Sequence, residues 1–243
     1  MRGMRTTPER HDDAQDHSVS TRRRSLVRAG ATAALALGGM ARAAERIGCV
    51  VRPQQTAGPF YVDERLQRSD LRTDPATGRT SDGVPLALSF AVTRRSASSC
   101  EPLRGARVDV WQCDAQGRYS DVRGFGASTT GQRFLRGYQR CDAAGLATFT
   151  TIVPGWYPGR AVHIHFRIDA PAADGRTSTF ISQLYFDDAL VDRVHAHPAY
   201  ARRTGRRLRN AEDGLFGDGG AQLLLAATPA GAGYAGRFDL ALE

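Results

Sequence analysis

The chain has 243 residues, of which 33 are basic and 25 acidic, and its formal net charge is +8. No residue is a lysine, and residues 1–43 contain eight arginines against four acidic residues, so this segment supplies half of the excess charge. The remaining arginines are scattered and not interleaved with aromatic residues, which argues against a nucleic-acid partner.

The first 43 residues are predicted to be a targeting segment. Polar residues 1–21 precede Arg22-Arg23-Arg24-Ser25-Leu26-Val27-Arg28, and a small, mildly apolar run then ends at a small-x-small cleavage site, residues 41–43. This order resembles a twin-arginine signal with Arg23 and Arg24 as the invariant pair. The apolar run is too short and too rich in Ala and Gly for a stable membrane anchor. We therefore expect an exported protein, periplasmic or extracellular, that meets the twin-arginine translocation machinery and keeps one mature domain, residues 44–243.

Four cysteines lie in this mature part: Cys49, Cys100, Cys113 and Cys141. An even number in an exported chain favours disulfides over thiolate metal ligands, and no Cys-x-x-Cys spacing is present. Cys113 and Cys141 fall near the ends of predicted strands, and Cys49 and Cys100 near the starts of segments. All three connectivities stay open, but this placement favours pairing 49 with 100 and 113 with 141.

The mature domain is predicted to be all-β. Residues 47–83 contain many turn residues and no sustained period, so they are expected to form an irregular arm. Beyond them, apolar residues alternate with period two in short segments that Gly and Pro separate, while only residues 188–195 have a helical pattern. This pattern predicts a β-sandwich with long loops and little helix. The predicted strands are residues 86–92, 108–110, 162–168, 180–186, 223–226 and 238–242.

The stretch at residues 150–168 contains the strongest indication of chemistry. In an extended strand His163 and His165 point to one face, while the apolar residues between and around them point to the other. Two imidazoles so placed can bind one metal ion, because neutral imidazole is a common transition-metal ligand. A Pro/Gly turn before the strand could bring Tyr157 and Arg160 towards the same ion. A surface His-x-His pair is the alternative, but the apolar opposite face and this turn favour a metal site.

Two other features are weaker indications. Tyr119 follows a turn at residues 114–117, where a lone tyrosine is usually a half-buried packing residue. A second His-x-His pair, His195 and His197, follows the helical segment and precedes a proline, so it is expected to be a solvated helix end.

Taken together, these residues resemble the intradiol ring-cleavage dioxygenases, non-haem iron(III) enzymes that include catechol 1,2-dioxygenase and both chains of protocatechuate 3,4-dioxygenase. The matching groups follow the family's order and spacing over about residues 50–243. The long N-terminal helical region of catechol 1,2-dioxygenases is missing, so the chain is similar to the exported, single-domain branch. The matching groups are Gly105-Ala106-x-Val108-Asp109-Val110-Trp111, Asp114-x-x-Gly117-x-Tyr119, Leu135-Arg136-Gly137-Tyr138-Gln139, Asp142-x-x-Gly145, Phe149-x-Thr151-Ile152-x-Pro154-Gly155-x-Tyr157, Arg160-x-x-His163-Ile164-His165 and Gln183-Leu184-Tyr185-Phe186.

The resemblance implies a set of iron ligands and residues that contact the substrate. Tyr157 would be the ligand that leaves when a catechol chelates the metal. Arg160 would steady negative charge on the ring, and Gln183 would lie in the pocket. Tyr61 is either a residue of the pocket lining or a packing tyrosine. The implied ligands of Fe(III) are Tyr119, Tyr157, His163 and His165.

The implied activity is cleavage of a catechol-type aromatic diol with O2 to a cis,cis-muconate-type diacid, in the catabolism of aromatic compounds. One alternative is a non-catalytic exported β-sandwich that binds iron, an aromatic ligand or a polymer. A zinc hydrolase is a weaker alternative, because two tyrosinates are an unusual set of zinc ligands. The physiological catechol and the formation of a homo-oligomer stay open.

Overall fold

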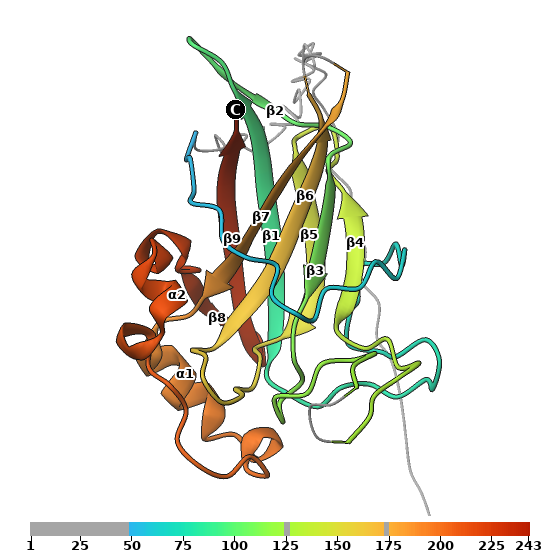
Figure 1. The fold of residues 1–243 in the computed structure, drawn as a ribbon, viewed down its shortest axis with the longest axis vertical. Coiled ribbons are helices and arrows are strands. Elements are labelled where there is room, and N and C mark those ends of the chain that lie inside the picture. The colour runs from blue at the N-terminus through green and yellow to red at the C-terminus, as the bar shows by residue number, and fades with distance from the viewer. Residues whose placement is uncertain (1–48, 124–126, 173–174) are drawn as a thin grey trace, which may run out of the picture. The chain divides into compact units, whose positions relative to one another are not determined.

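A computed structural model describes residues 49–123, 127–172 and 175–243, which belong to one compact unit, Glu45–Glu243. The predicted targeting segment, residues 1–43, lies outside the described residues. The predicted all-β sandwich is confirmed: two sheets form its layers (Figure 1). The strands are β1 (Pro85–Arg95), β2 (Cys100–Pro102), β3 (Arg107–Trp111), β4 (Arg136–Arg140), β5 (Leu146–Ile152), β6 (His163–Pro171), β7 (Thr177–Tyr185), β8 (Ala227–Ala230) and β9 (Gly233–Leu242).

The first sheet has the order β2-β1-β9-β8, with β5 also paired to β1, and the second has the order β4-β3-β6-β7. β1 and β9 run parallel to each other, whereas every other named pair of strands is antiparallel. The second sheet holds the residues that the sequence suggested for chemistry, since His163 and His165 lie in β6 and Gln183 lies opposite His165 in β7.

The core between the sheets is built around aromatic rings. The ring centroid of Phe90 in β1 lies 5.1 Å from that of Phe166 in β6 and 6.2 Å from that of Phe238 in β9. All three side chains are buried, and each such burial stabilises the fold by roughly 1.5–3 kcal/mol. Because side chains alternate along a strand, the inward position of Phe166 places His163 and His165 on the outer face of the sheet.

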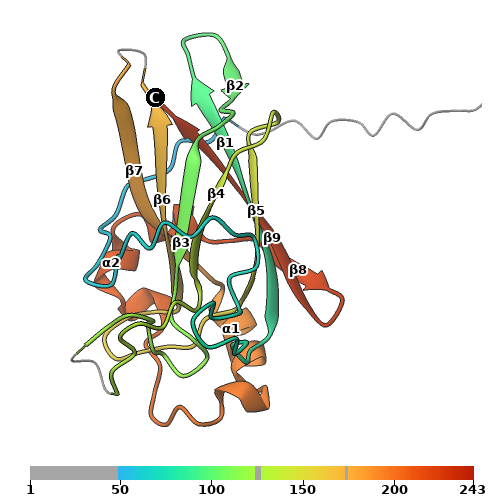
Figure 2. The same cartoon turned by 90° about the vertical axis from the view of Figure 1, so that its right-hand side faces the viewer.

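The arm, residues 49–83, is irregular as predicted, and part of it crosses this outer face (Figure 2). At one edge the backbone N–H of Gln55 donates to the carbonyl of Ile181 in β7 at 2.9 Å. At the other edge the N–H of Arg68 donates to the carbonyl of Tyr138 in β4 at 3.1 Å. The arm therefore satisfies backbone groups at both edges of the sheet and covers the outward-pointing residues between them.

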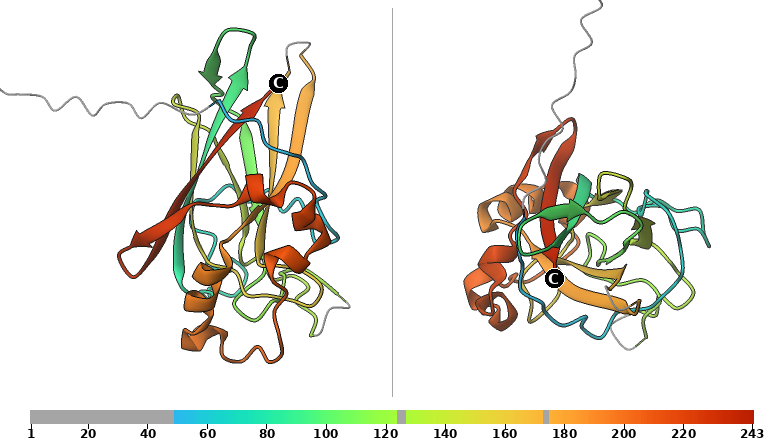
Figure 3. Two further views of the ribbon diagram at one scale, coloured as in Figure 1. Left: turned by 90° about the vertical axis from the view of Figure 1, so that its left-hand side faces the viewer. Right: turned by 90° about the horizontal axis from the view of Figure 1, so that it is seen from above.

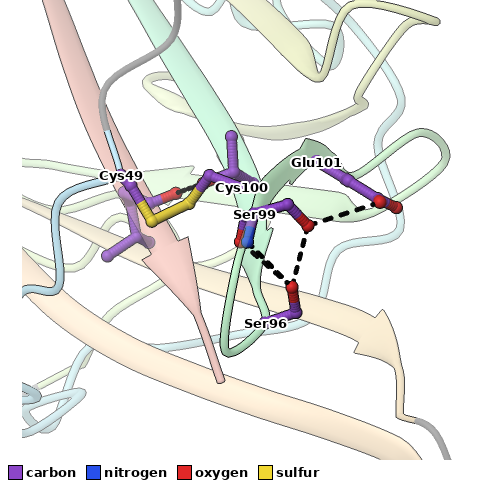
Figure 4. Close-up of a disulfide and its surroundings, with 7 residues drawn as sticks. Cys49, Ser96, Ser99, Cys100 and Glu101 are labelled. Carbon is purple, nitrogen blue, oxygen red and sulfur yellow. Dashed lines mark hydrogen bonds between the residues drawn. A yellow bond between two sulfur atoms is a disulfide. The ribbon is translucent and has the colours of Figure 1, made fainter.

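A disulfide joins the start of the arm to the first sheet (Figure 4). Cys49 and Cys100 are bonded, with their Cα atoms 5.6 Å apart. The turn that presents Cys100 is closed by the N–H of Ser96, which donates to the carbonyl of Ser99 at 2.8 Å, and by the N–H of Ser99, which donates to the Ser96 hydroxyl at 3.1 Å. The predicted pairing of 49 with 100 is confirmed.

The predicted pairing of Cys113 with Cys141 is wrong, because both are free and buried. Each follows a strand, but β3 and β4 are antiparallel neighbours, so their C-terminal ends lie at opposite ends of the sheet. Along the strand direction, the ends where Cys113 and Cys141 lie are about 20 Å apart, which is far beyond the reach of a disulfide.

The helical segments lie together on one side, outside both sheets (Figure 3). The helix predicted at 188–195 is confirmed as α1 (Asp188–His195), and the carboxylate of Asp187 caps it by accepting from the N–H of Leu190 at 3.0 Å. Within the described ranges no helix has the length and apolar character needed to cross a membrane. The others are α2 (Gly214–Gly217) and the 3-10 turns η1 (Pro198–Tyr200), η2 (Asn210–Glu212) and η3 (Gly220–Leu223).

Two local predictions are wrong. Residues 223–226 form no strand: Leu223 ends η3, and Leu224 makes only an isolated bridge to Tyr185. Their apolar pattern has another cause, since Leu223 and Leu225 are buried in an irregular segment. His195 is not solvated: its Nε2 lies 3.0 Å from the carbonyl oxygen of Pro154, although His197 is exposed as expected.

Candidate active site

Two tyrosines and two histidines meet at the end of the second sheet where β6 begins. Tyr157 Oη lies 3.0 Å from His163 Nε2, which in turn lies 3.1 Å from His165 Nε2. Tyr119 Oη lies 3.5 Å from the same His163 nitrogen. Tyr119 comes from the loop after β3 and Tyr157 from the turn before β6, so the fold places donor atoms from separate segments around one point.

The protonation of these groups favours a cation among them. His163 Nδ1 lies 2.7 Å from the carbonyl of Ala161 and must donate to it, so Nε2 carries a lone pair. Burial lowers the pKa of His163 to about 3 and that of His165 well below its usual value, so both rings are neutral. Two neutral imidazoles whose Nε2 atoms face each other at 3.1 Å are well suited to share a metal ion.

The tyrosines complete the donor set. Burial raises the pKa of Tyr157 to about 12 and that of Tyr119 well above its usual value, so both phenols stay protonated unless a cation lies beside them. Across the described ranges no group of three or more His, Cys, Asp or Glu side chains could hold an ion. A metal here therefore depends on the phenol oxygens, and two hard oxygens with two imidazoles suit ferric iron.

Arg136 of β4 holds the loop of Tyr119 against the arm. This arginine is buried, and its guanidinium donates to the carbonyl of Ser120 at 2.7 Å and to that of Phe60 at 2.6 Å. Phe60 in turn stacks on the ring of Tyr119, with centroids 4.4 Å apart. One side chain thus ties together the segments that enclose Tyr119.

His165 is held between a ring and a backbone. The indole of Trp111 stacks on it with centroids 5.0 Å apart and an interplanar angle of 3°. On the arm, Gly58 has a φ of +67°, and a Cβ atom there would lie 3.2 Å from His165 Cε1. The imidazole has little freedom to turn, and glycine suits this position both for its φ and for its missing side chain.

Arg160 and Gln183, which the sequence suggested separately, are in direct contact. Arg160 Nη2 donates to Gln183 Oε1 at 2.6 Å and to the hydroxyl of Tyr185 at 3.1 Å, while Nε donates to Asp213 Oδ2 at 3.0 Å. Gln183 is fixed in turn, because its amide donates to the carbonyl of Thr56 at 3.0 Å. The guanidinium also counteracts the effect of burial on the pKa of Tyr157.

Tyr61 lies apart from this group. It packs against Trp111, with ring centroids 4.8 Å apart, and under the guanidinium of Arg167. Its neighbour Phe60 is the arm residue that stacks on Tyr119 and meets Tyr157 edge-on at 5.9 Å.

Several residues of the site were not predicted from the sequence. Tyr185 carried a usable signal, because it follows Gln183 by two positions in a strand and so shares its face. Trp111 carried a similar signal. It lies three positions after the inward-facing Val108 in a strand, so its side chain points to the opposite, outward face. Asp213 carried none, since it reaches Arg160 from an irregular segment 53 residues away.

Comparison with known proteins shows similarity to dioxygenases. A family model described as a dioxygenase matches residues 56–203. The chain is similar to the solved intradiol ring-cleavage dioxygenase from Tetranychus urticae, at 30% identity and a TM-score of 0.67, over 79% of this chain and 94% of that one. It is also similar to the dioxygenase domain of a dioxygenase and carbohydrate-binding protein fusion from Streptomyces sp. SirexAA-E, at 31% identity and a TM-score of 0.56, over 80% and 99% of the two chains.

Curated relatives agree. The protocatechuate 3,4-dioxygenase beta chain of Burkholderia cepacia is 34% identical over 138 residues, which cover 53% of this chain and 56% of that protein. The chain spans about half the length of the curated relatives it matches. From the extent of the family match and the coverage of the solved structures, the chain belongs to the intradiol ring-cleavage dioxygenase family.

Proposed function

We propose that the protein holds a non-haem ferric ion with Tyr119, Tyr157, His163 and His165 and cleaves the ring of a catechol-type aromatic with O2. The observation that carries the proposal is the approach of two phenol oxygens and two imidazole nitrogens to within 3.0–3.5 Å of their neighbours in the group. The product would be a cis,cis-muconate-type diacid. Family membership supports the reaction class.

When bound, the ferric ion would supply Lewis acidity, keeping the tyrosines as phenolates and drawing electron density from a chelated catechol ring. The two tyrosines differ in their surroundings. Tyr119 is buried beneath Phe60, whereas Tyr157 is half-buried and lies on a Pro/Gly turn beside Arg160. Tyr157 is therefore the residue with room to move aside, and its oxygen is placed to accept one of the catechol protons.

Arg160 and Gln183 would act on the substrate. The guanidinium of Arg160 is fixed on two sides, by Asp213 and by Gln183 with Tyr185, so its charge stays beside the reacting ring without reorganisation. A preorganised cation of this kind stabilises negative charge that develops on the ring and its oxygens. The indole of Trp111 and the ring of Phe60 exclude water from the donors they cover.

We also propose that the protein works outside the cytoplasm. Support comes from the disulfide between Cys49 and Cys100, since such bonds persist in oxidising compartments, together with the twin-arginine-like sequence.

The test is the visible absorption spectrum of the iron-loaded protein. Tyrosinate bound to ferric iron gives a burgundy charge-transfer band, so we expect a coloured protein whose band moves to longer wavelength when a catechol is added without air. Admitting air should bleach the shifted band and release a diacid. Catechol, protocatechuate and hydroxyquinol form the substrate panel.

Variants assign the band to residues. Tyr119→Phe and Tyr157→Phe should each change or weaken the band, because each removes one phenolate. Tyr138→Phe is the matched control, since the Tyr138 hydroxyl bonds only to the amide oxygen of Gln67 among the described residues and lies on β4. A colourless wild-type protein that takes up no ferric iron would refute the ligand set. A coloured protein that binds catechols but never consumes O2 would instead favour a binding protein.

A further inference from the structure

Asp213 is a carboxylate that is almost fully buried next to the site, with 3% of the residue exposed. Its Oδ2 accepts from Arg160 Nε at 3.0 Å and from the backbone N–H of Ala161 at 2.8 Å. Its Oδ1 accepts from the N–H of Leu215 at 2.9 Å, in the first turn of α2. One side chain therefore joins α2 to the turn that leads into β6.

Helix capping does not account for this charge. Asn and Ser cap a helix about as well as Asp, and α2 has only four residues. A buried carboxylate costs free energy unless a cation offsets it, and Arg160 is the cation in contact with Asp213 among the residues described. The negative charge of Asp213 is therefore explained by its ion pair with the guanidinium of Arg160, not by helix capping.

The contact also fixes the orientation of the guanidinium. Asp213 takes the Nε–H of Arg160, while Gln183 and Tyr185 take Nη2, and Nη1 enters none of these three bonds. With two corners of a planar group held by partners on different elements, the group cannot rotate about its long axis. Without Asp213, the guanidinium would be held only at Nη2 by Gln183 and Tyr185 among these partners, and would have no carboxylate beside it.

We propose that Asp213 is a positioning residue, which orients Arg160 by a buried ion pair so that the guanidinium faces the substrate ring. This inference rests on the proposed function, in which Arg160 stabilises charge on a bound catecholate.

The experiment compares Asp213→Asn with Asp187→Asn in the full, iron-loaded protein. Asn has the shape of Asp, and its amide oxygen can still accept from the N–H of Leu215 and so cap α2. Its NH2 group cannot accept from Arg160 in place of Oδ2, so the substitution removes both the charge and the bond to the guanidinium. Asp187 is the control, because its carboxylate caps α1 in the same way, through the N–H of Leu190 at 3.0 Å. We expect Asp213→Asn to keep its iron and its resting tyrosinate band, to shift the anaerobic catecholate band, and to lower kcat by about 10- to 100-fold. Asp187→Asn should leave the band and kcat unchanged.

A double variant separates positioning from a general structural role. If Asp213 acts through Arg160, then Asp213→Asn should cost little further activity when added to Arg160→Gln. Penalties that multiply, or an Asp213→Asn enzyme with wild-type kcat and an unshifted catecholate band, would overturn the inference.

The position of the anaerobic catecholate band can be measured without any turnover of substrate. A wild-type protein that shows the iron band without turnover would therefore remove the proposed reaction, while a catecholate shift in Asp213→Asn would still support the positioning role. A wild-type protein with no iron band would overturn both.

Discussion

Asp109 carries a buried charge on the outer face of β3, on the same side of the sheet as the site. Burial raises the pKa of its carboxyl to about 6, although the guanidinium of Arg107, at 2.6 Å, opposes this. An unfolded aspartate titrates near pH 4, so between about pH 4 and 6 the folded protein binds more protons than the unfolded chain. The free energy of unfolding therefore contains a contribution that falls as pH rises through this window.

We expect Asp109→Asn to flatten the dependence of stability on pH in that window. The contribution removed is at most about 3 kcal/mol, from a shift of roughly two pKa units. Urea unfolding at pH 4.5 and pH 7 measures it, and Asp239→Asn, at a half-exposed aspartate paired with Arg237, is the control. Identical pH slopes for wild type and Asp109→Asn would show that Asp109 does not titrate as described.

Besides its contacts through Phe60 and Thr56, the arm constrains the site at one glycine, Gly58. Gly58→Ala would place a Cβ atom 3.2 Å from His165 Cε1 and hold an alanine at a φ of +67°. Gly78 in the same arm has a φ of +70° and nothing within 4 Å of a Cβ atom, so Gly78→Ala shares the backbone strain, about 1 kcal/mol, without the contact. We expect both variants to lose similar backbone stability, and Gly58→Ala in addition to lose iron affinity because His165 must move.

Iron content after dialysis against a chelator, together with thermal melting, distinguishes these effects. Equal iron retention in the two variants would mean that the arm does not constrain His165.

At the scale of the whole molecule, the disulfide closes a large loop. Cys49 and Cys100 are 51 residues apart, and closing such a loop stabilises a protein by about 4 kcal/mol in the chain-entropy model. We expect Cys49→Ser with Cys100→Ser to lower the unfolding midpoint in urea by a corresponding amount, and Cys141→Ala, which removes a free buried thiol, to have a smaller effect. Thiol titration of the denatured, unreduced wild type should find two free thiols, and four would contradict the bond.

Much of the fold could be predicted because each strand can be recognised from the alternation of apolar residues within its own sequence. β1, β6, β7 and β9 each have one face in the core, so their apolar residues alternate in the sequence. The same alternation placed His163 and His165 on one outward face, and the Pro/Gly turn before the strand suggested Tyr157 and Arg160. The resemblance to a family added Tyr119 and Gln183 and gave all of them roles.

The features that were predicted wrongly or not at all depend on contacts between distant segments. The pairing of Cys113 required the relative direction of β3 and β4, which period two does not encode. The pattern at 223–226 arises from packing against the end of β7, not from strand pairing. Asp213 and Phe60 enter the site from irregular segments, where no period indicates which neighbour they will meet.

The parallel pairing of β1 with β9 bears on how the chain folds. β9 lies beside β1 in the middle of the first sheet, where partners such as Leu86 and Tyr234 come from opposite ends of the described chain. Such long-range pairing slows folding, because the entropy of closing the loop is lost before the contacts form. The first sheet, and with it the core that supports the site, can be completed only after β9 has been synthesised and has paired with β1.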